Sequence, residues 1–251
     1  EEMTSDLRTH LTRLIAYAES ADTSLQQEVA EKLANEAVKP ARQQQIVEVG
    51  GLKLLLPLTE SRDMEVRRLA AHALANLSVN ADNQVTMADQ GGIEMLVTLV
   101  ETAGEGPAID AVHRQASKAL ANLGVNANNK EKISAVGGIS PLINLAGSSN
   151  PAVAVEAIAA LANLAVNDGN EIEIAEKGGI APILDAATSR DADLQSQSAR
   201  ALRNLSVHPD NKKKILELDG AEVLRRLGRT VDSDKVRQQV NRALANLGVD
   251  A

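Results

Sequence analysis

The stretch ALANLSVN, residues 73–80, places Asn76 inside an apolar run of helical character. Close copies recur along the chain as KLANEAV, ALANLGVN, ALANLAVN, ALRNLSVH and ALANLGVD. The asparagines of the six copies are Asn35, Asn76, Asn122, Asn163, Asn204 and Asn246. They are separated by 41, 46, 41, 41 and 42 residues. Self-similarity at a fixed period of this length indicates an array of structural repeats.

A second marker, usually a Gly-Gly pair, follows the same period. It appears in VGGLKLLLPL, QGGIEMLVTL, VGGISPLINL, KGGIAPILDA and LDGAEVLRRL, at intervals of 41, 46, 41 and 41 residues. The five-residue excess falls in the same unit for both markers and maps to ETAGEGPAIDAVH, residues 101–113. This stretch is predicted to be a loop that carries the insertion between two helices.

Each unit is predicted to contain three helices. A short helix such as NQVTMADQ precedes the Gly-Gly turn, a second such as IEMLVTLV follows it, and a longer third such as MEVRRLAAHALANLSV ends the unit. Asn80, Asn126 and Asn167 stand just after third helices, where they are expected to cap a helix end. No stretch alternates polar and apolar residues with period 2, so no strands are expected.

These features together resemble the armadillo repeat, and HEAT repeats match less well because they lack the glycine pair. The resemblance implies an all-α, right-handed α-solenoid of about six repeats in a single domain spanning residues 1–251. Residues 1–40 are interpreted as a degenerate first repeat or cap without the Gly-Gly pair. The successive repeats are predicted at residues 41–81, 82–127, 128–168, 169–208 and 209–251.

Composition argues against several classes of function. The sequence contains no Cys, Phe or Trp and a single Tyr, Tyr17, and its net charge is −8. A nucleic-acid-binding solenoid is an alternative, and it would need stacking aromatics or a strong positive field. The four histidines lack metal-ligand spacing, and no phosphate-binding loop or nucleophile elbow is present. We therefore expect neither an enzyme nor a cofactor or metal, and no apolar run approaches the ~20 residues of a membrane span.

Helical phase places the repeated asparagine at the edge of the apolar stripe. Taking Asn76 as zero, Ala70, Leu74 and Leu77 lie near 100–160°, while the position four residues before Asn76 shares its face. A primary amide can pair with the backbone N–H and C=O of an extended peptide. The resemblance implies that third helices line a concave groove in which this Asn does so. Alternatively, the amide could bond the neighbouring repeat and fix the superhelix.

The predicted groove face carries mostly basic residues. The predicted site comprises Asn76, Asn122, Asn163, Asn204, Asn246, Arg68, His72, Arg114, Lys118, Arg200 and Arg242, with Glu28, Glu31 and Glu156 as acidic exceptions. This pattern favours an extended acidic, phosphorylated or carboxylate-bearing partner; the alternative is an ordinary solvated face. Nuclear-import members of the family carry Trp four residues before the Asn, and its absence here argues against binding of nuclear-localisation signals.

The stretches EVAEKLANEAVKPARQQQIVEVGGL and RRLAAHALANLSVNADNQ are similar to an apicomplexan group that consists of little more than an armadillo array. That resemblance implies a cytoplasmic scaffold on the cytosolic face of an organelle, tethering rhoptries to a myosin and to cyclase-linked proteins. Its lipidated N-terminus would precede Glu1, since the chain opens with EEMTSDL rather than with Met. The alternatives are a general adaptor, as in plant or ciliary armadillo proteins, and binding through the convex face or residues 101–113.

Overall fold

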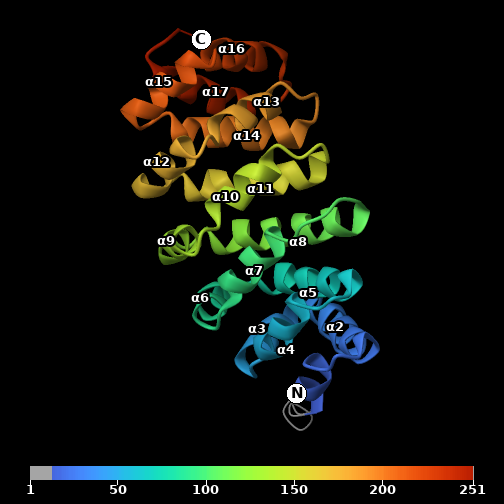
Figure 1. Cartoon of the computed structure of the whole chain (residues 1–251). Coiled ribbons are helices and arrows are strands. Elements are labelled where there is room, and N and C mark those ends of the chain that lie inside the picture. Colours follow the sequence, from blue (N-terminus) through green and yellow to red (C-terminus); the bar gives the residue numbers. More distant parts are fainter. Residues whose placement is uncertain (1–12, 251) are drawn as a thin grey trace. The chain divides into compact units, whose positions relative to one another are not determined.

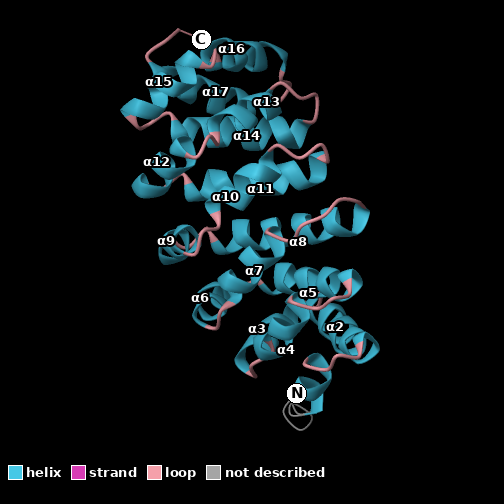
Figure 2. Cartoon of the chain, in the orientation of Figure 1, coloured by secondary structure: helices cyan, strands magenta, loops and turns pink. Residues whose placement is uncertain are grey.

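The computed structural model describes residues 13–250, which form helices and connecting turns with no β-strand among them (Figure 2). The prediction of an all-α fold is therefore confirmed. The chain packs as two compact units that divide between Asn129 and Lys130, and each is described by itself. Residues 1–12, which contain the start of the predicted first repeat, lie outside the described range.

The helices follow the predicted three-helix order (Figure 1). The short helices that start each repeat are α3 (Pro40–Glu48), α6 (Ala81–Asp89), α9 (Ala127–Ala135), α12 (Asp168–Glu176) and α15 (Pro209–Glu217). The second helices are α4 (Leu52–Thr59), α7 (Gly92–Val100), α10 (Ile139–Ala146), α13 (Ile180–Ala187) and α16 (Gly220–Thr230). The third helices are α2 (Thr23–Ala37), α5 (Met64–Leu77), α8 (Pro107–Leu123), α11 (Pro151–Leu164), α14 (Ala192–Leu205) and α17 (Asp234–Leu247). The short first helices begin within one residue of the predicted repeat boundaries; the single domain and the right-handed sense of the solenoid stay predictions.

Within each unit, helices of the same kind stack on one another. In the first unit α2 packs against α5 and α5 against α8, while α3 packs against α6 and α4 against α7. In the second unit α11 packs against α14 and α14 against α17, with α10, α13 and α16 stacked in the same order. Within each unit, neighbouring repeats therefore bury their apolar stripes against one another, as expected for a repeat array.

The predicted apolar stripe of the third helices forms the core. Ala70, Leu74 and Leu77 of α5 are fully buried, as are the equivalent alanine and two leucines of α8 and of α11. The chain has no Phe or Trp and a single Tyr, so these Leu and Ala side chains fill the space between closely packed helices. The apolar phase read from the sequence is thus the one that the packing uses.

The two glycines of the turn between first and second helices serve different needs. Gly91 adopts φ +86°, a left-handed conformation that costs residues with a Cβ about 1–2 kcal/mol. Gly92 has ordinary dihedrals, but a Cβ there would lie 2.7 Å from the carbonyl oxygen of Met87. In the last repeat Asp219 stands at the first of these positions with φ +57°, the single non-glycine residue of positive φ among those described.

The five-residue insertion is not confined to a loop, so this prediction was wrong in part. Helix α8 begins at Pro107, and the loop before it spans residues 101–106. The other third helices of complete repeats have 14 residues and α8 has 17, so three inserted residues extend the helix and two lengthen the loop. Pro at the first helical position explains the earlier start, because its missing N–H needs no partner there.

A buried asparagine in each short first helix of four repeats connects successive repeats. These residues are Asn83, Asn129, Asn170 and Asn211, and all are at most 3% exposed. Asn83 Nδ2 donates to the carbonyls of Gln43 and Leu77, each at 3.0 Å. Asn129 does the same with Gln84 and Leu123, while Asn211 donates to Glu171, one repeat earlier. The bonds to Leu77 and Leu123 satisfy carbonyls that a helix end leaves without partners, and those to Gln43, Gln84 and Glu171 connect the first helices of successive repeats. The sequence pattern had not singled out these asparagines.

The predicted helix caps are confirmed. Asn80 Oδ1 accepts from the backbone N–H of Asp82, and Asn167 Oδ1 accepts from that of Asn170. Asn126 Oδ1 accepts from the N–H groups of the second and third residues after it. Every polar side chain here accepts a bond from a donor that the first turn of a helix leaves free.

We expect substitutions of two adjacent residues in the turn between α15 and α16 to change the free energy of unfolding in opposite directions. Asp219→Gly should raise the free energy of unfolding by about 0.5–1 kcal/mol, because it removes the left-handed strain. Gly220→Ala should lower it by more than about 1 kcal/mol, since its Cβ would lie 2.7 Å from the Ile215 carbonyl oxygen. Urea denaturation followed by circular dichroism measures both, and equal effects of one sign would contradict this account of the turn.

We expect Asn83→Ala to lower the free energy of unfolding by about 2 kcal/mol, because two buried carbonyls lose their donor. Asn122→Ala is the matched comparison: it removes one half-buried bond to a hydroxyl and should cost about 1 kcal/mol or less. The two variants are compared by chemical denaturation under identical conditions. A smaller cost for Asn83→Ala than for Asn122→Ala would show that the buried asparagines do not hold the repeats together.

Candidate functional site

The repeated asparagines of the third helices, which we call the Asn strip, are Asn76 and Asn122 in the first unit and Asn163, Asn204 and Asn246 in the second. All of them are partly exposed, at the edge of the buried stripe. Asn35 of α2, the equivalent residue in the degenerate repeat, is exposed. The phase predicted from the sequence therefore places these amides correctly, between core and solvent.

In the first unit the strip amides bond within the stack of third helices. Asn122 Nδ2 donates to Ser78 Oγ at 3.0 Å, and Ser78 is fully buried at the C-cap of α5. Asn76 Nδ2 lies 3.1 Å from Nε2 of His72, one turn earlier on the same helix. Burial, followed by the charges of Arg68 and Lys118, lowers the pKa of His72 below its ordinary value. The imidazole is therefore neutral at pH 7 and accepts from the amide.

In the second unit Asn204 and Asn246 reach back to the preceding third helix, whereas Asn163 accepts from Arg200 of the following one. Asn204 Nδ2 donates to the carbonyl of Ala162 at 2.8 Å. Asn246 Nδ2 donates at 3.1 Å both to the carbonyl of Arg203 and to Ser206 Oγ. The strip thus forms the inter-repeat bonds that the sequence left open as the alternative to peptide binding.

A strip amide can bond the neighbouring repeat and also bind a peptide, because a primary amide has two N–H donors and two acceptor lone pairs. Asn122 donates one N–H to Ser78, so its second N–H and its oxygen can still bind a ligand. The inter-repeat bond also fixes the amide plane in advance, which reduces the entropy lost when a ligand binds. Asn122 is therefore a preorganised amide rather than a free side chain, while Asn246, whose Nδ2 donates to two acceptors, keeps its oxygen for a ligand.

The predicted cations fall into two groups. Arg68 is held by both carboxylate oxygens of Glu65, at 2.7 and 2.6 Å. Arg200 is half-buried and donates to Asn163 Oδ1 at 2.7 Å and to the carbonyl of Ala159. Burial and then the charge of Arg203 lower its pKa. These two arginines have structural partners and contribute less charge to the surface than the sequence suggested.

The second group of predicted cations is available to a ligand. Arg114 and Lys118 on α8 and Arg242 on α17 are exposed, and none forms a hydrogen bond or ion pair with the described side chains. Among the predicted acidic exceptions, Glu31 accepts from Gln27 at the exposed surface of α2. Among the predicted site residues, free positive charge is therefore found at these three positions.

A concave site is present where α14 and α17 pack together. A cavity of about 270 Å³ is lined by Arg203, Asn204, Val207, Arg242, Ala245 and Asn246. It brings together three predicted site residues, two strip asparagines and one free cation. Arg203 and Val207 were missed; the recurrence of Val three residues after each strip Asn was the signal that could have identified Val207. A larger cavity of about 940 Å³, lined by Arg190, Asp219 and Thr230 among others, contains no predicted site residue.

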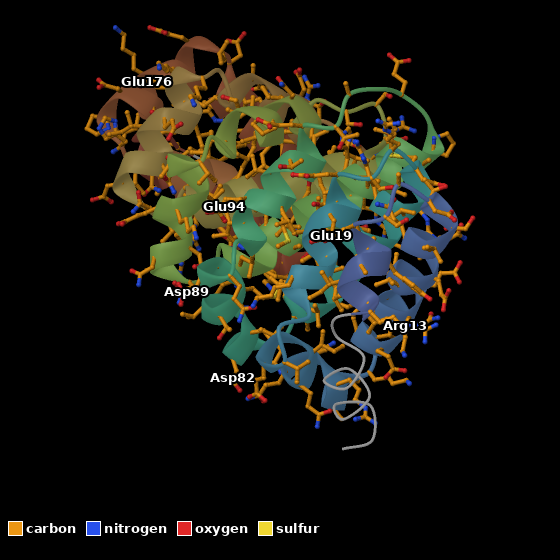
Figure 3. All side chains as sticks on the ribbon, turned by 60° about the horizontal axis from the view of Figure 1, so that its bottom comes forward. Arg13, Glu19, Asp82, Asp89, Glu94 and Glu176 are labelled. Carbon is orange, nitrogen blue, oxygen red and sulfur yellow. The ribbon has the colours of Figure 1, made fainter. Side chains whose placement is uncertain are left out.

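Acidic side chains also lie on the first and second helices. In Figure 3, Asp82 and Asp89 project outward from α6, Glu94 from α7 and Glu176 from α12. The acidic side chains behind the net charge of −8 are thus distributed over first, second and third helices. Among the described residues no cluster of His, Asp and Glu could hold a metal ion. Across residues 13–250, every helix is too short or too polar to cross a bilayer.

The comparisons with known proteins agree with the repeat pattern. A family model, the Armadillo/beta-catenin-like repeat, matches residues 39–79, 126–166 and 167–207. An engineered protein of known crystal structure is 34% identical, with 94% of this chain and 95% of that chain covered and a TM-score of 0.82. A designed armadillo repeat protein in complex with the peptide (KR)4 is 24% identical, with coverages of 94% and 98% and a TM-score of 0.80. No curated protein matches the chain.

We expect the His72 environment to make stability depend on pH. An unfolded histidine titrates near pH 6.5, whereas the folded pKa is lower. As the pH falls below about 6.5 the unfolded state gains the proton first, so the free energy of unfolding decreases. His72→Gln keeps a partner for Asn76 but does not titrate. Urea denaturation at pH 7.5 and 5.5 should show that the free energy of unfolding falls more for the wild type than for His72→Gln. Equal decreases would contradict a lowered pKa of His72 in the folded state.

Proposed function

The chain belongs to the armadillo repeat family, and from that premise we propose that it is a non-catalytic scaffold whose third helices bind an extended, acidic segment of a partner protein. The observation that carries the proposal is the concave site between α14 and α17. It combines two strip asparagines with the unpaired guanidinium of Arg242. Amides and a cation converging in a cavity suit a peptide backbone that carries carboxylates.

The Asn strip supplies the part of recognition that does not depend on sequence. An extended peptide presents the N–H and C=O of the same residue along one edge, and a fixed amide can pair with both. Asn122 and Asn246 are already oriented by bonds to Ser78 and Ser206. Binding therefore needs little rearrangement of the scaffold.

Charge supplies the preference for acidic segments. The designed protein described above was solved with (KR)4, a basic peptide. This chain has no Trp, and the positions four residues before its strip asparagines include Lys118, Arg200 and Arg242. Cations at these positions repel Lys and Arg and attract carboxylates or phosphates, which favours the opposite class of ligand.

A nucleic-acid ligand is the less favoured alternative. The chain has a net charge of −8 and one aromatic residue, Tyr17, whereas single-stranded binding uses stacking aromatics and a positive groove. Binding through the insertion is now a hypothesis about residues 101–106, because residues from Pro107 onward belong to α8. The narrower hypothesis, a tether of rhoptries to a myosin and cyclase-linked proteins, rests on the sequence resemblance alone.

We expect the acidic peptide (DE)4 to bind and (KR)4 not to bind in fluorescence anisotropy at low salt. Lys118→Glu and Arg242→Glu should each weaken (DE)4 binding about five- to tenfold and reduce its salt dependence, because each replaces an attraction by a repulsion.

Lys213→Glu, an equal charge reversal on the short helix α15, is the matched control and should have a much smaller effect. Affinity for (DE)4 that is unchanged by both third-helix reversals would refute binding on this face.

A further inference from the structure

Five valines with strongly exposed side chains occupy one position of the repeat. They are Val38, Val79, Val125, Val166 and Val207, with exposures of 55–62%. Each stands three residues after a repeated asparagine. Isolated exposed apolar residues are normal on a protein surface, but a recurrence at one position in both units needs a separate explanation. We call these residues the Val strip.

The Val strip is held at a fixed place relative to the Asn strip. The backbone N–H of Val79 donates to the carbonyl of Asn76, and that of Val207 donates to the carbonyl of Asn204, at 3.3 and 3.4 Å. Val125 and Val166 make the same bond to their own asparagines. Each valine thus lies one turn beyond its amide, at the C-terminal end of the third helix.

The local structure does not require valine at this position of the repeat. The side chains are mostly in water, so burial in the core does not account for them. The residue before each valine varies among Ala, Ser and Gly, while valine itself recurs. An apolar side chain kept at this point is therefore best explained by a ligand that covers it.

The cations and the valines lie on opposite sides of the amides. On α17, Arg242 precedes Asn246 by four residues, about 6 Å along the helix axis. Val207 follows Asn204 by three residues, just beyond the C-terminal end of α14 at Leu205. The cavity between these two helices contains Arg242 and Val207 together with both asparagines. One ligand in this cavity can therefore contact both Arg242 and Val207.

Strand geometry assigns each side a different set of ligand side chains. When one edge of an extended backbone pairs with the strip amides, its side chains point alternately to the two flanks. One flank faces the cations and the other faces the valines. An alternating sequence would thus place all its acidic residues on one side and all its aliphatic residues on the other.

We propose that the Val strip selects aliphatic side chains, so that the partner segment alternates acidic and aliphatic residues. This inference rests on the proposed function, because it requires an extended acidic segment on the Asn strip. In the first unit Val125 lies beyond Asn122 on the side opposite Lys118, and in the second Val207 and Arg242 line the same cavity. Aliphatic specificity comes from apolar area removed from water on both partners.

The test uses two peptides of equal charge and nearly equal shape, (DV)4 and (DT)4. Wild-type protein should bind (DV)4 about five- to tenfold more tightly than (DT)4 in fluorescence anisotropy, because the valine side chains bury apolar surface. The variant Val79→Thr/Val125→Thr/Val207→Thr should lose that preference and bind (DT)4 as the wild type does. Val85→Thr, an exposed valine on α6 outside the strip, is the matched control and should keep the preference.

The outcomes separate this inference from the function on which it rests. Equal binding of both peptides to the wild type, or a preference that survives the triple substitution, overturns the role of the Val strip while acidic binding stands. Failure of (DV)4, (DT)4 and (DE)4 alike overturns the proposed function and this inference with it. Thermal unfolding of each variant checks that these surface substitutions leave the fold intact.

Discussion

The stack of repeats depends on side-chain amides that satisfy backbone carbonyls across each repeat junction. Asn83 ties α6 to the carbonyls of Gln43 and Leu77, and Asn211 reaches back one repeat in the same way. Apolar packing alone is not directional, and a stack of similar Leu and Ala surfaces could slide along the helix axes. A buried amide restricts that freedom, because any other register would leave buried polar groups without partners.

The strip asparagines extend this principle to the surface. Asn122 and Asn246 bond the preceding third helix through a buried serine, and the same amides remain partly exposed. Structural and binding roles therefore lie on one side chain, which explains why the repeat retains Asn there. It also explains why removal of such a residue would affect both stability and any ligand, and why matched controls are needed to separate the two.

The periodic features were predictable from the sequence, whereas the partners of individual side chains were not. Two independent markers with one period defined the repeats, and helical phase placed Asn76 at the edge of the core. Sequence could not show that Glu65 holds Arg68 or that Arg200 is half-buried, because both depend on rotamers and neighbouring helices. The buried Asn83 was missed since a polar residue in a short polar helix looks like a surface residue. The Val strip was visible in the sequence, but it resembled core residues until its exposure was known.

The longer helix α8 shows where the architecture tolerates change. Its three additional residues lie at the N-terminal end, whereas Asn122 and Val125 are at the opposite end and keep the spacing found in other repeats. Growth at this end lengthens the helix without disturbing the register of the amides. The junction around residues 101–106 is consequently a natural point for grafting a foreign peptide or reporter. New sequence could be displayed there while the residues that contact the neighbouring repeat retain their positions.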